Sequence, residues 1–166
     1  VITGFVAVAV GICASAFADD QAVQTIIDTH WQWTLDTYPE LRREYGDRSG
    51  NTTWTDVSPS AEQQRQQRRI DFASKLEAIE PAELSDDMRL NRTMLLSELH
   101  HDILAFEHGM HLMPINMRSG PQHRHSVAER LSFDTEQDYR DWLARLRALP
   151  AQLQQYEDLL IEGMAR

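Results

Sequence analysis

The chain has 166 residues, and its 16 Lys+Arg against 26 Asp+Glu give a formal net charge of −10 at pH 7. This length suits one domain at most, and 42% hydrophobic with 25% charged residues is ordinary globular usage, which excludes a fibrous repeat and wholesale disorder. Nucleic-acid binding needs a face rich in Lys and Arg, so the acidic balance predicts no nucleic-acid partner.

The N-terminal segment has the pattern of an export signal. Residues 1–18 are an apolar run that ends in the triplet Ala16-Phe17-Ala18, just before two acidic residues. The run is short for a membrane span, which needs about 20 apolar residues. No basic residue precedes it, so we interpret residues 1–18 as an N-terminally truncated signal peptide rather than a buried helix. We expect an exported protein, periplasmic or extracellular, with no stable membrane span after cleavage.

The chain has a single cysteine, Cys13, within this signal. A mature chain without it has no disulfide and no thiolate chemistry. A lipid anchor on Cys13 stays open as an alternative, although bulky Ile12 precedes it where a small residue is expected.

Helical periodicity begins at Asp19. Apolar residues recur at three- and four-residue steps and predict a first helix that ends near Tyr38-Pro39. Trp31 lies in phase with this face and is expected to pack, whereas Trp33 is out of phase and is expected at the surface or an interface. Residues 46–58 are rich in Gly, Asn, Thr and Asp and predict a loop.

The next two helices have recognisable starts. Ser58-Pro59 predicts a cap for a second helix, which should run to about Ile79 with a core edge that includes Phe72 and Leu76. Ser85 predicts a cap for a long third helix, whose apolar spacing continues through Met110 to the break at Pro114.

Residues 113–122 predict a linker, after which Asp134 or Thr135 opens a fourth helix. Its expected core positions are Tyr139, Trp142, Leu143, Leu146 and Leu149. Pro150 then restarts a fifth helix. No β-alternation of any length occurs, so the sequence predicts an all-α, bundle-like array of about five helices in residues 19–166.

A cluster of acidic residues and histidines lies on the third helix. In an unbroken helix His100, Glu107 and His111 fall on one stripe, and Glu98-x-x-His101 matches half of a di-iron motif. A second Glu-x-x-His is absent from the sequence, and such residues are common on solvated faces. A metal site is the alternative hypothesis here, on the following residues: Glu98, His101, Glu107, His108 and His111.

Several catalytic motifs are missing. The sequence has no His-Glu dipeptide, and therefore no H-E-x-x-H zinc helix. It also has no G-x-S-x-G elbow, no P-loop and no G-x-G-x-x-G. These 166 residues contain no recognisable catalytic site, so we assign none.

Five short motifs occur in a characteristic order from about Asp28 onward. They are Tyr38-Pro39 with Tyr45-Gly46; the stretch Trp54 to Pro59; Asn91 with Leu95 to Leu99; Met113 to Asn116 with Gly120; and Asp138-Tyr139 leading to Arg145-Leu146 and Leu149-Pro150. Glu162-Gly163 follows them. In this order the chain resembles the N-terminal part of the bacterial family called domain of unknown function 885, whose members are mostly exported, largely helical and similar to zinc metallopeptidases.

The resemblance implies that residues 19–166 are the N-terminal helical part of a larger domain, whose missing C-terminal part is this chain's own partner. It places a His-Glu zinc motif beyond Arg166, with zinc as the cofactor and peptides as the substrates of the full-length parent. The chain alone should then be inactive, and its candidate substrate contacts are Trp33, Trp54, Asn116 and Arg118.

Three functional hypotheses follow. The first is an N-terminal, non-catalytic portion of an exported zinc-metallopeptidase-like hydrolase, which lines or supports the substrate cleft. The second is a complete exported helical binding domain without catalysis. The third is a metal-binding helical bundle.

Overall fold

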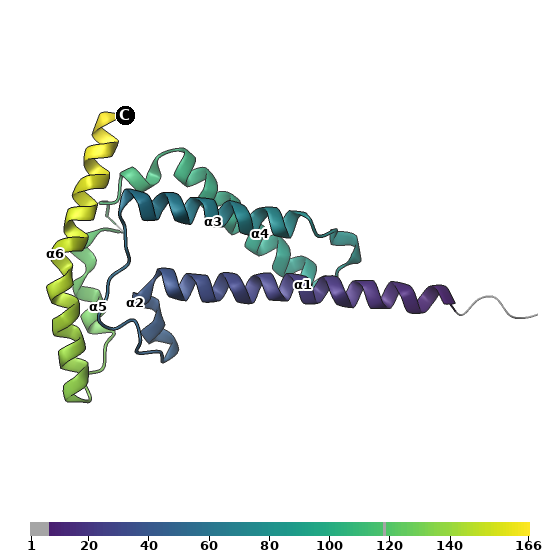
Figure 1. Ribbon diagram of the computed structural model, residues 1–166, viewed down its shortest axis with the longest axis horizontal. Helices are drawn as coiled ribbons and strands as arrows, with labels where there is room; N and C mark the ends of the chain where they lie inside the picture. Colours follow the sequence, from purple (N-terminus) through teal and green to yellow (C-terminus); the bar gives the residue numbers. More distant parts are fainter. Residues whose placement is uncertain (1–6, 118) are drawn as a thin grey trace, which may run out of the picture. The chain divides into compact units, whose positions relative to one another are not determined.

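The computed structural model describes residues 7–117 and 119–166, with side chains from Ala18 onward. Within them the protein is all-α: α-helices and short 3₁₀ turns are joined by loops, without a strand, which confirms the predicted fold class (Figure 1). No helix in this part of the chain is long and apolar enough to cross a membrane. The proposed signal, residues 1–18, lies outside the described side chains except for its last residue.

The described chain forms two compact units. The first unit comprises residues up to Trp31 and Gln67–Leu104, and the second comprises Gln32–Gln66 and Ala105–Arg166. Three helices contribute residues to both units: α1 (Ala7–Thr37), α3 (Pro59–Glu77) and α4 (Asp86–Glu107).

The first unit has an apolar core between α1, α3 and α4. Val23 and Leu76 are fully buried, and Phe72 and Leu99 are almost so. Each such side chain contributes about 1.5–3 kcal/mol relative to exposure. Phe72 and Leu76 are two of the core positions predicted from the sequence, because a four-residue step keeps side chains on one helix face.

Polar contacts close the turn between α3 and α4. Arg92 Nε donates to the Leu76 carbonyl oxygen at 2.9 Å, which satisfies a C-terminal carbonyl of α3. The 3₁₀ turn η2 (Pro81–Glu83) follows, and Ser85 Oγ accepts from the Met88 N–H at 3.4 Å, which confirms the predicted cap of α4. The sequence therefore specified this turn through its cap and its proline.

The second unit contains the shorter helices and the last long one. They are α2 (Pro39–Arg42), η1 (Arg43–Tyr45), η3 (Met110–Leu112), η4 (Pro121–His123), α5 (His125–Glu129) and α6 (Glu136–Ala165). Val57, Leu112, Tyr156 and Leu159 form its buried cluster. Segments 40–58 and 105–133 thus pack on α6 through a small apolar core.

The long central helix is shorter than predicted. It ends at Glu107, because Gly109 adopts φ 72°, a left-handed conformation that favours glycine and ends helices. Met110 and His111 lie in η3 rather than in the helix. The predicted helical stripe of His100, Glu107 and His111 is therefore wrong.

The predicted break at Pro150 is also wrong. Residues 136–165 form one helix with Pro150 inside it, opened by a capping box between Thr135 and Asp138. Buried side chains on both sides of the proline, Arg145 and Gln152, hold α6 against the same segment. Tertiary packing overrides the cost of an interior proline, about 3 kcal/mol.

The buried face of α6 differs from the predicted one. Tyr139, Leu143 and Leu146 are exposed to between 40% and 56%. Tyr156, which the apolar spacing after Pro150 predicts, is buried, and the other buried positions are Asp138, Arg145, Gln152 and Leu159. Residues 138, 145, 152 and 159 recur at seven-residue steps, and Tyr156 lies on the same helix face. Most of these buried side chains are polar, so apolar periodicity did not identify them.

Candidate functional site

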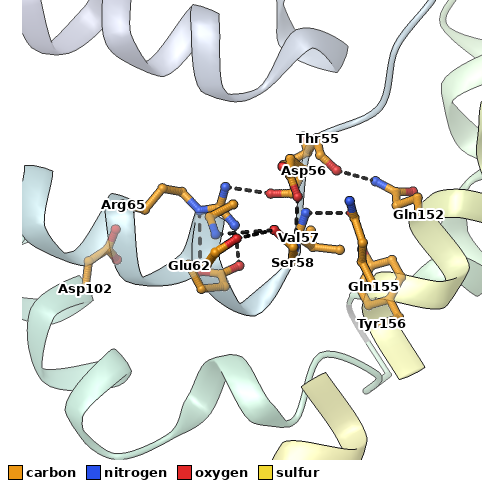
Figure 2. Close-up of polar contacts among 12 residues, drawn as sticks. Thr55, Asp56, Val57, Ser58, Glu62, Arg65, Asp102, Gln152, Gln155 and Tyr156 are labelled. Atoms are coloured by element: carbon orange, nitrogen blue, oxygen red, sulfur yellow. Dashed lines mark hydrogen bonds and ion pairs between the residues drawn. The ribbon is translucent and has the colours of Figure 1, made fainter. Parts of the chain in front are cut away.

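An extended segment of the second unit is fastened to α6 by side chains of that helix. Gln152 Nε2 donates to the Thr55 carbonyl oxygen at 2.8 Å, and Gln155 Oε1 accepts from the Val57 N–H at 3.0 Å (Figure 2). These amides replace the partners that a strand would find in a sheet, because buried backbone groups need hydrogen bonds. The segment is thereby fixed without regular secondary structure.

The same segment is also tied to the start of α3. Arg65 Nη1 donates to the Asp56 carbonyl oxygen at 2.7 Å, while its Nη2 pairs with Glu62 Oε1 at 2.5 Å (Figure 2). Ser58 Oγ accepts from the Ala61 N–H at 3.3 Å, so the predicted cap is confirmed. Residues 55–58 therefore have polar anchors on both α3 and α6.

Trp54 is the aromatic centre of this region. Its Nε1 donates to the Arg145 carbonyl oxygen at 2.7 Å, and its ring lies 6.3 Å from that of Trp142, edge to face. The guanidinium carbons of Arg124 and Arg145 both lie 5.3 Å from the Trp54 ring centroid, within cation–π range. The tryptophan thus packs against two cations.

The Glu40 carboxylate lies against Arg124 and also acts electrostatically on Arg145. Glu40 Oε1 lies 3.7 Å from Arg124 Nη1 and accepts from the Thr55 N–H at 3.1 Å. Arg124 Nη2 donates to the Tyr156 hydroxyl. We call Glu40, Trp54, Arg124, Arg145 and Tyr156 the arginine cluster; it connects α2, the residue before α5, and α6.

Arg145 is fully buried, and Gly50 accepts a hydrogen bond from its Nη2 through the backbone carbonyl. Burial lowers the pKa of Arg145 from its usual value, with nearby Arg124 acting in the same direction and Glu40 opposing it. Arg145 Nε and Nη1 have no hydrogen-bond partner among the described residues. The charge of Arg145 is therefore compensated by Glu40 and Asp141 and by the Trp54 ring.

Three of the four predicted substrate contacts lie among the described residues. Trp54 is 9% exposed and acts as a packing anchor, while Trp33 is half-buried. Asn116 is exposed, and its side chain closes a loop by donating to Ser119 Oγ at 2.7 Å and accepting from the Ser119 N–H at 3.0 Å. Arg118 lies outside the described residues.

The exposure of Trp31 and Trp33 is the reverse of the predicted one. Trp31 is 41% exposed although it is in phase with the apolar face, whereas Trp33 is half-buried. The first unit ends at Trp31, and Trp33 belongs to the second. A single helical phase across both units is therefore the wrong basis for placing these side chains.

The alternative metal ligands are distributed over separate places. Glu98 and His101 border a shallow hollow along α4, while Glu107 and His108 border another hollow with Leu112 of η3. His111 stacks on Phe106 at 4.0 Å between ring centroids, and burial lowers its pKa. Within the described residues, no group of three or more His, Cys, Asp or Glu side chains could hold a metal ion.

A groove of about 450 Å³ runs between α1 and α4 in the first unit. From α1 it is lined by Gln24, Ile27, His30 and Trp31, whose spacing of three and four residues places them on one helix face. Gln24 Nε2 donates to Asp28 Oδ1 at 2.8 Å, and its Oε1 is an amide acceptor. The α1 side is thus apolar with a polar edge.

From α4 the groove is lined by Asn91, Met94, Leu95 and Glu98, again at helical spacing. Leu95 is buried, whereas Met94 is 63% exposed. The volume is within the range of small-ligand pockets, about 300–1,000 Å³. We call these eight residues of α1 and α4 the α1–α4 groove.

His30 joins the groove to the core of the first unit. Its ring meets Phe72 edge to face at 5.2 Å between centroids. Burial lowers the pKa of His30 from 6.5, and the positive charge of Arg69 lowers it further. Glu98 and Asp102 act in the opposite direction but do not outweigh burial. Arg69 Nε lies 3.2 Å from Asp102 Oδ2. His30 is therefore neutral at pH 7.

The sequence did not identify the buried arginines or the groove. Arg124 and Arg145 carried no motif of a known site, and Arg145 was noted only as part of a family-like dipeptide. A signal for Arg145 did exist, because it lies seven residues from both Asp138 and Gln152 on the buried face of α6. The groove requires two helices to meet, which periodicity within one helix does not predict.

Within the described residues, the protein is an all-α array that contains the arginine cluster and the α1–α4 groove. A family model described as "bacterial protein of unknown function (DUF885)" matches residues 39–166, which is most of the chain, and the chain belongs to this family. No curated protein and no solved structure matches it.

Proposed function

We propose that this chain is the N-terminal, non-catalytic portion of an exported, zinc-metallopeptidase-like hydrolase that acts on peptides. The observation that carries the proposal is the family match over residues 39–166, which covers the arginine cluster and nearly all of the second unit. The export pattern of residues 1–18 supports the periplasmic or extracellular location.

The described residues do not fit a zinc site. They offer no group of three His, Cys, Asp or Glu side chains for a metal, and the sequence has no His-Glu pair. We therefore assign no catalytic step to this chain. In the proposal, the zinc ligands and the general base belong to residues outside this sequence, and the helices described here support the substrate cleft.

The arginine cluster suits a supporting role. Trp54, Gln152 and Gln155 fix the backbone of residues 54–57 on α6 through hydrogen bonds of 2.7–3.0 Å. A wall held this way keeps its shape when a peptide is bound, because its buried polar groups have little freedom to move. Among the proposed peptide contacts that the structure describes, Asn116 is the exposed one, in its closed loop.

The test compares two substitutions in the enzyme produced from the complete reading frame. Asn116→Ala is expected to raise KM for peptide hydrolysis several-fold and to lower thermal stability modestly, because its two hydrogen bonds to Ser119 are lost. Trp54→Phe is expected to lower stability and leave KM close to that of the unmodified enzyme. An Asn116→Ala enzyme with unchanged KM would remove Asn116 from the cleft.

The α1–α4 groove favours the second candidate function, a helical binding domain without catalysis. Such a domain needs no zinc and hydrolyses nothing, so the two candidates differ in metal content. A full-length product with less than about a tenth of an equivalent of zinc favours the binding domain, because a functional site is close to stoichiometric.

A further inference from the structure

The charge and chemistry of the α1–α4 groove select its ligand. Among the described residues that line it, Glu98 is the side chain that carries a full charge at pH 7, since His30 is held neutral by burial. Arg69, whose charge acts on His30, pairs with Asp102 at 3.2 Å, and Arg92 of α4 donates to the Leu76 carbonyl oxygen at 2.9 Å. The groove therefore presents one net negative charge.

The neutral polar groups of the groove can accept hydrogen bonds from a cationic ligand. Gln24 donates one Nε2 hydrogen to Asp28 Oδ1 at 2.8 Å, and its Oε1 can accept a hydrogen bond; Asn91 contributes a second amide oxygen from α4. An ammonium group donates three hydrogen bonds and accepts none, which matches a carboxylate with two amide oxygens.

The rest of the lining is apolar and aromatic. Ile27, Leu95 and Met94 provide an aliphatic surface, and Trp31 leaves 41% of its area exposed. An indole face attracts a cation within about 6 Å of the ring, and its apolar surface also packs against a hydrocarbon body. A fully hydrated metal ion would gain nothing from these groups.

From this geometry we propose that the α1–α4 groove binds a small amphipathic organic cation, namely a primary ammonium ion on an aromatic or branched alkyl body. Glu98 pairs with the ammonium group, Trp31 covers the cation and the adjacent carbon chain, and the aliphatic residues hold the body. The site is independent of the proposed hydrolase function. The chain's net charge of −10 further raises the local concentration of cations.

The test uses calorimetric titration of the purified protein with three probes of similar size: 2-phenylethylammonium, the neutral 3-phenylpropan-1-ol and the anionic 3-phenylpropionate. We expect saturable binding of one ammonium ion per chain with Kd of about 1 mM or tighter, which is reasonable for a ligand of this size. The alcohol should bind about tenfold more weakly and the anion should not bind. Equal binding of the alcohol and the ammonium ion would overturn the proposal, since the groove would then select only for apolar surface.

Two groove variants and a matched control locate the site. Glu98→Gln should weaken ammonium binding about tenfold or more, because a charge-assisted hydrogen bond is lost. Trp31→Leu should weaken it about fivefold. Glu107→Gln, an exposed glutamate of the same helix outside the groove, should leave Kd unchanged.

The variants change exposed side chains, so far-ultraviolet circular dichroism should show an unchanged helical content. Equal weakening by Glu98→Gln and Glu107→Gln would mean that overall charge and not the groove attracts the cation, which contradicts the proposal. The comparison of the three probes needs no variant and decides the question even if a variant fails to fold.

Discussion

Single side chains of the second unit hold its irregular segments in place. Trp54 illustrates this, because one indole makes a hydrogen bond to the α6 backbone and packs against Trp142 and two guanidinium groups. Such a residue contributes through several contacts at once, and they are lost together when it is replaced.

Trp54→Phe should lower the free energy of unfolding by about 1–2 kcal/mol. Phenylalanine keeps a ring in the pocket but loses the donor to the Arg145 carbonyl oxygen and leaves unfilled volume. Urea unfolding measures the change. Trp31→Phe, at a 41% exposed position, is the matched control and should change stability by less than about 0.5 kcal/mol. Equal effects would show that Trp54 is not an anchor.

Histidine titration should make the first unit less stable in acid. Burial lowers the pKa of His30 in the folded chain, so the unfolded chain binds the proton more readily. The stability that His30 contributes is fully present above its unfolded value of 6.5 and is lost as the pH falls through its folded pKa. His111 has the same sign, because burial lowers its pKa too.

The check is urea unfolding of the protein, His30→Gln and His101→Gln at about pH 7.5 and about pH 5. His30→Gln should lose less stability between the two pH values than the unmodified protein does. His101→Gln, which replaces an exposed histidine of α4, should behave as the unmodified protein. The same acid loss in all three would exclude His30 as a source.

At the scale of elements, the features that could be predicted are those encoded locally. The cap at Ser58, the cap at Ser85 and the end of α1 before Pro39 each depend on a few neighbouring residues, and each is confirmed. The end of α4 at Glu107 depends on the left-handed conformation of Gly109. The continuity of α6 through Pro150 depends on tertiary packing. Apolar periodicity does not report either of them.

The candidate site was less predictable than the helices for a related reason. Sequence patterns highlighted aromatic and metal-ligating residues, whereas the second unit is organised by buried Arg145 and Gln152, residue types that are usually exposed. Asn116 could be named from its family-like motif, but its loop closure through Ser119 follows from the fold of residues 113–122.

The continuity of α6 predicts that Pro150→Ala is stabilising. Alanine restores the backbone donor to the Leu146 carbonyl oxygen, at a helix position where proline costs about 3 kcal/mol. The unfolded chain with alanine has more conformational freedom, which reduces this gain in stability by about 1 kcal/mol. The net gain should be about 2 kcal/mol, measured as an increase in the urea midpoint. A loss of stability would mean that the proline sets a bend that α6 needs.

The contact between α6 and η3 depends on Gly163. A Cβ atom at this position would lie 3.0 Å from the Leu112 carbonyl oxygen and 3.1 Å from Leu112 Cβ. Gly163→Ala should therefore lower stability by about 1–3 kcal/mol despite alanine's better helix propensity. Ala151→Gly, an exposed position of α6, calibrates the propensity difference, about 1 kcal/mol. A stabilised Gly163→Ala protein would show that η3 moves away freely.

At the scale of the whole molecule, the protein combines two kinds of surface within an all-α family member. The second unit, which lies almost entirely within the family match, has a buried polar network suited to a rigid wall. The first unit has an acidic groove suited to a small cation. The proposed function and the proposed ligand site thus rest on different residues and can fail separately.

The most direct test of the central claim is peptide hydrolysis by the product of the complete reading frame that contains codons 1–166, measured beside residues 19–166 alone. We predict that the full product hydrolyses peptides, loses this activity when its metal is chelated, and regains it when zinc is added. Residues 19–166 alone should hydrolyse no peptide. A full product that holds less than about a tenth of an equivalent of zinc and hydrolyses no peptide would contradict the account.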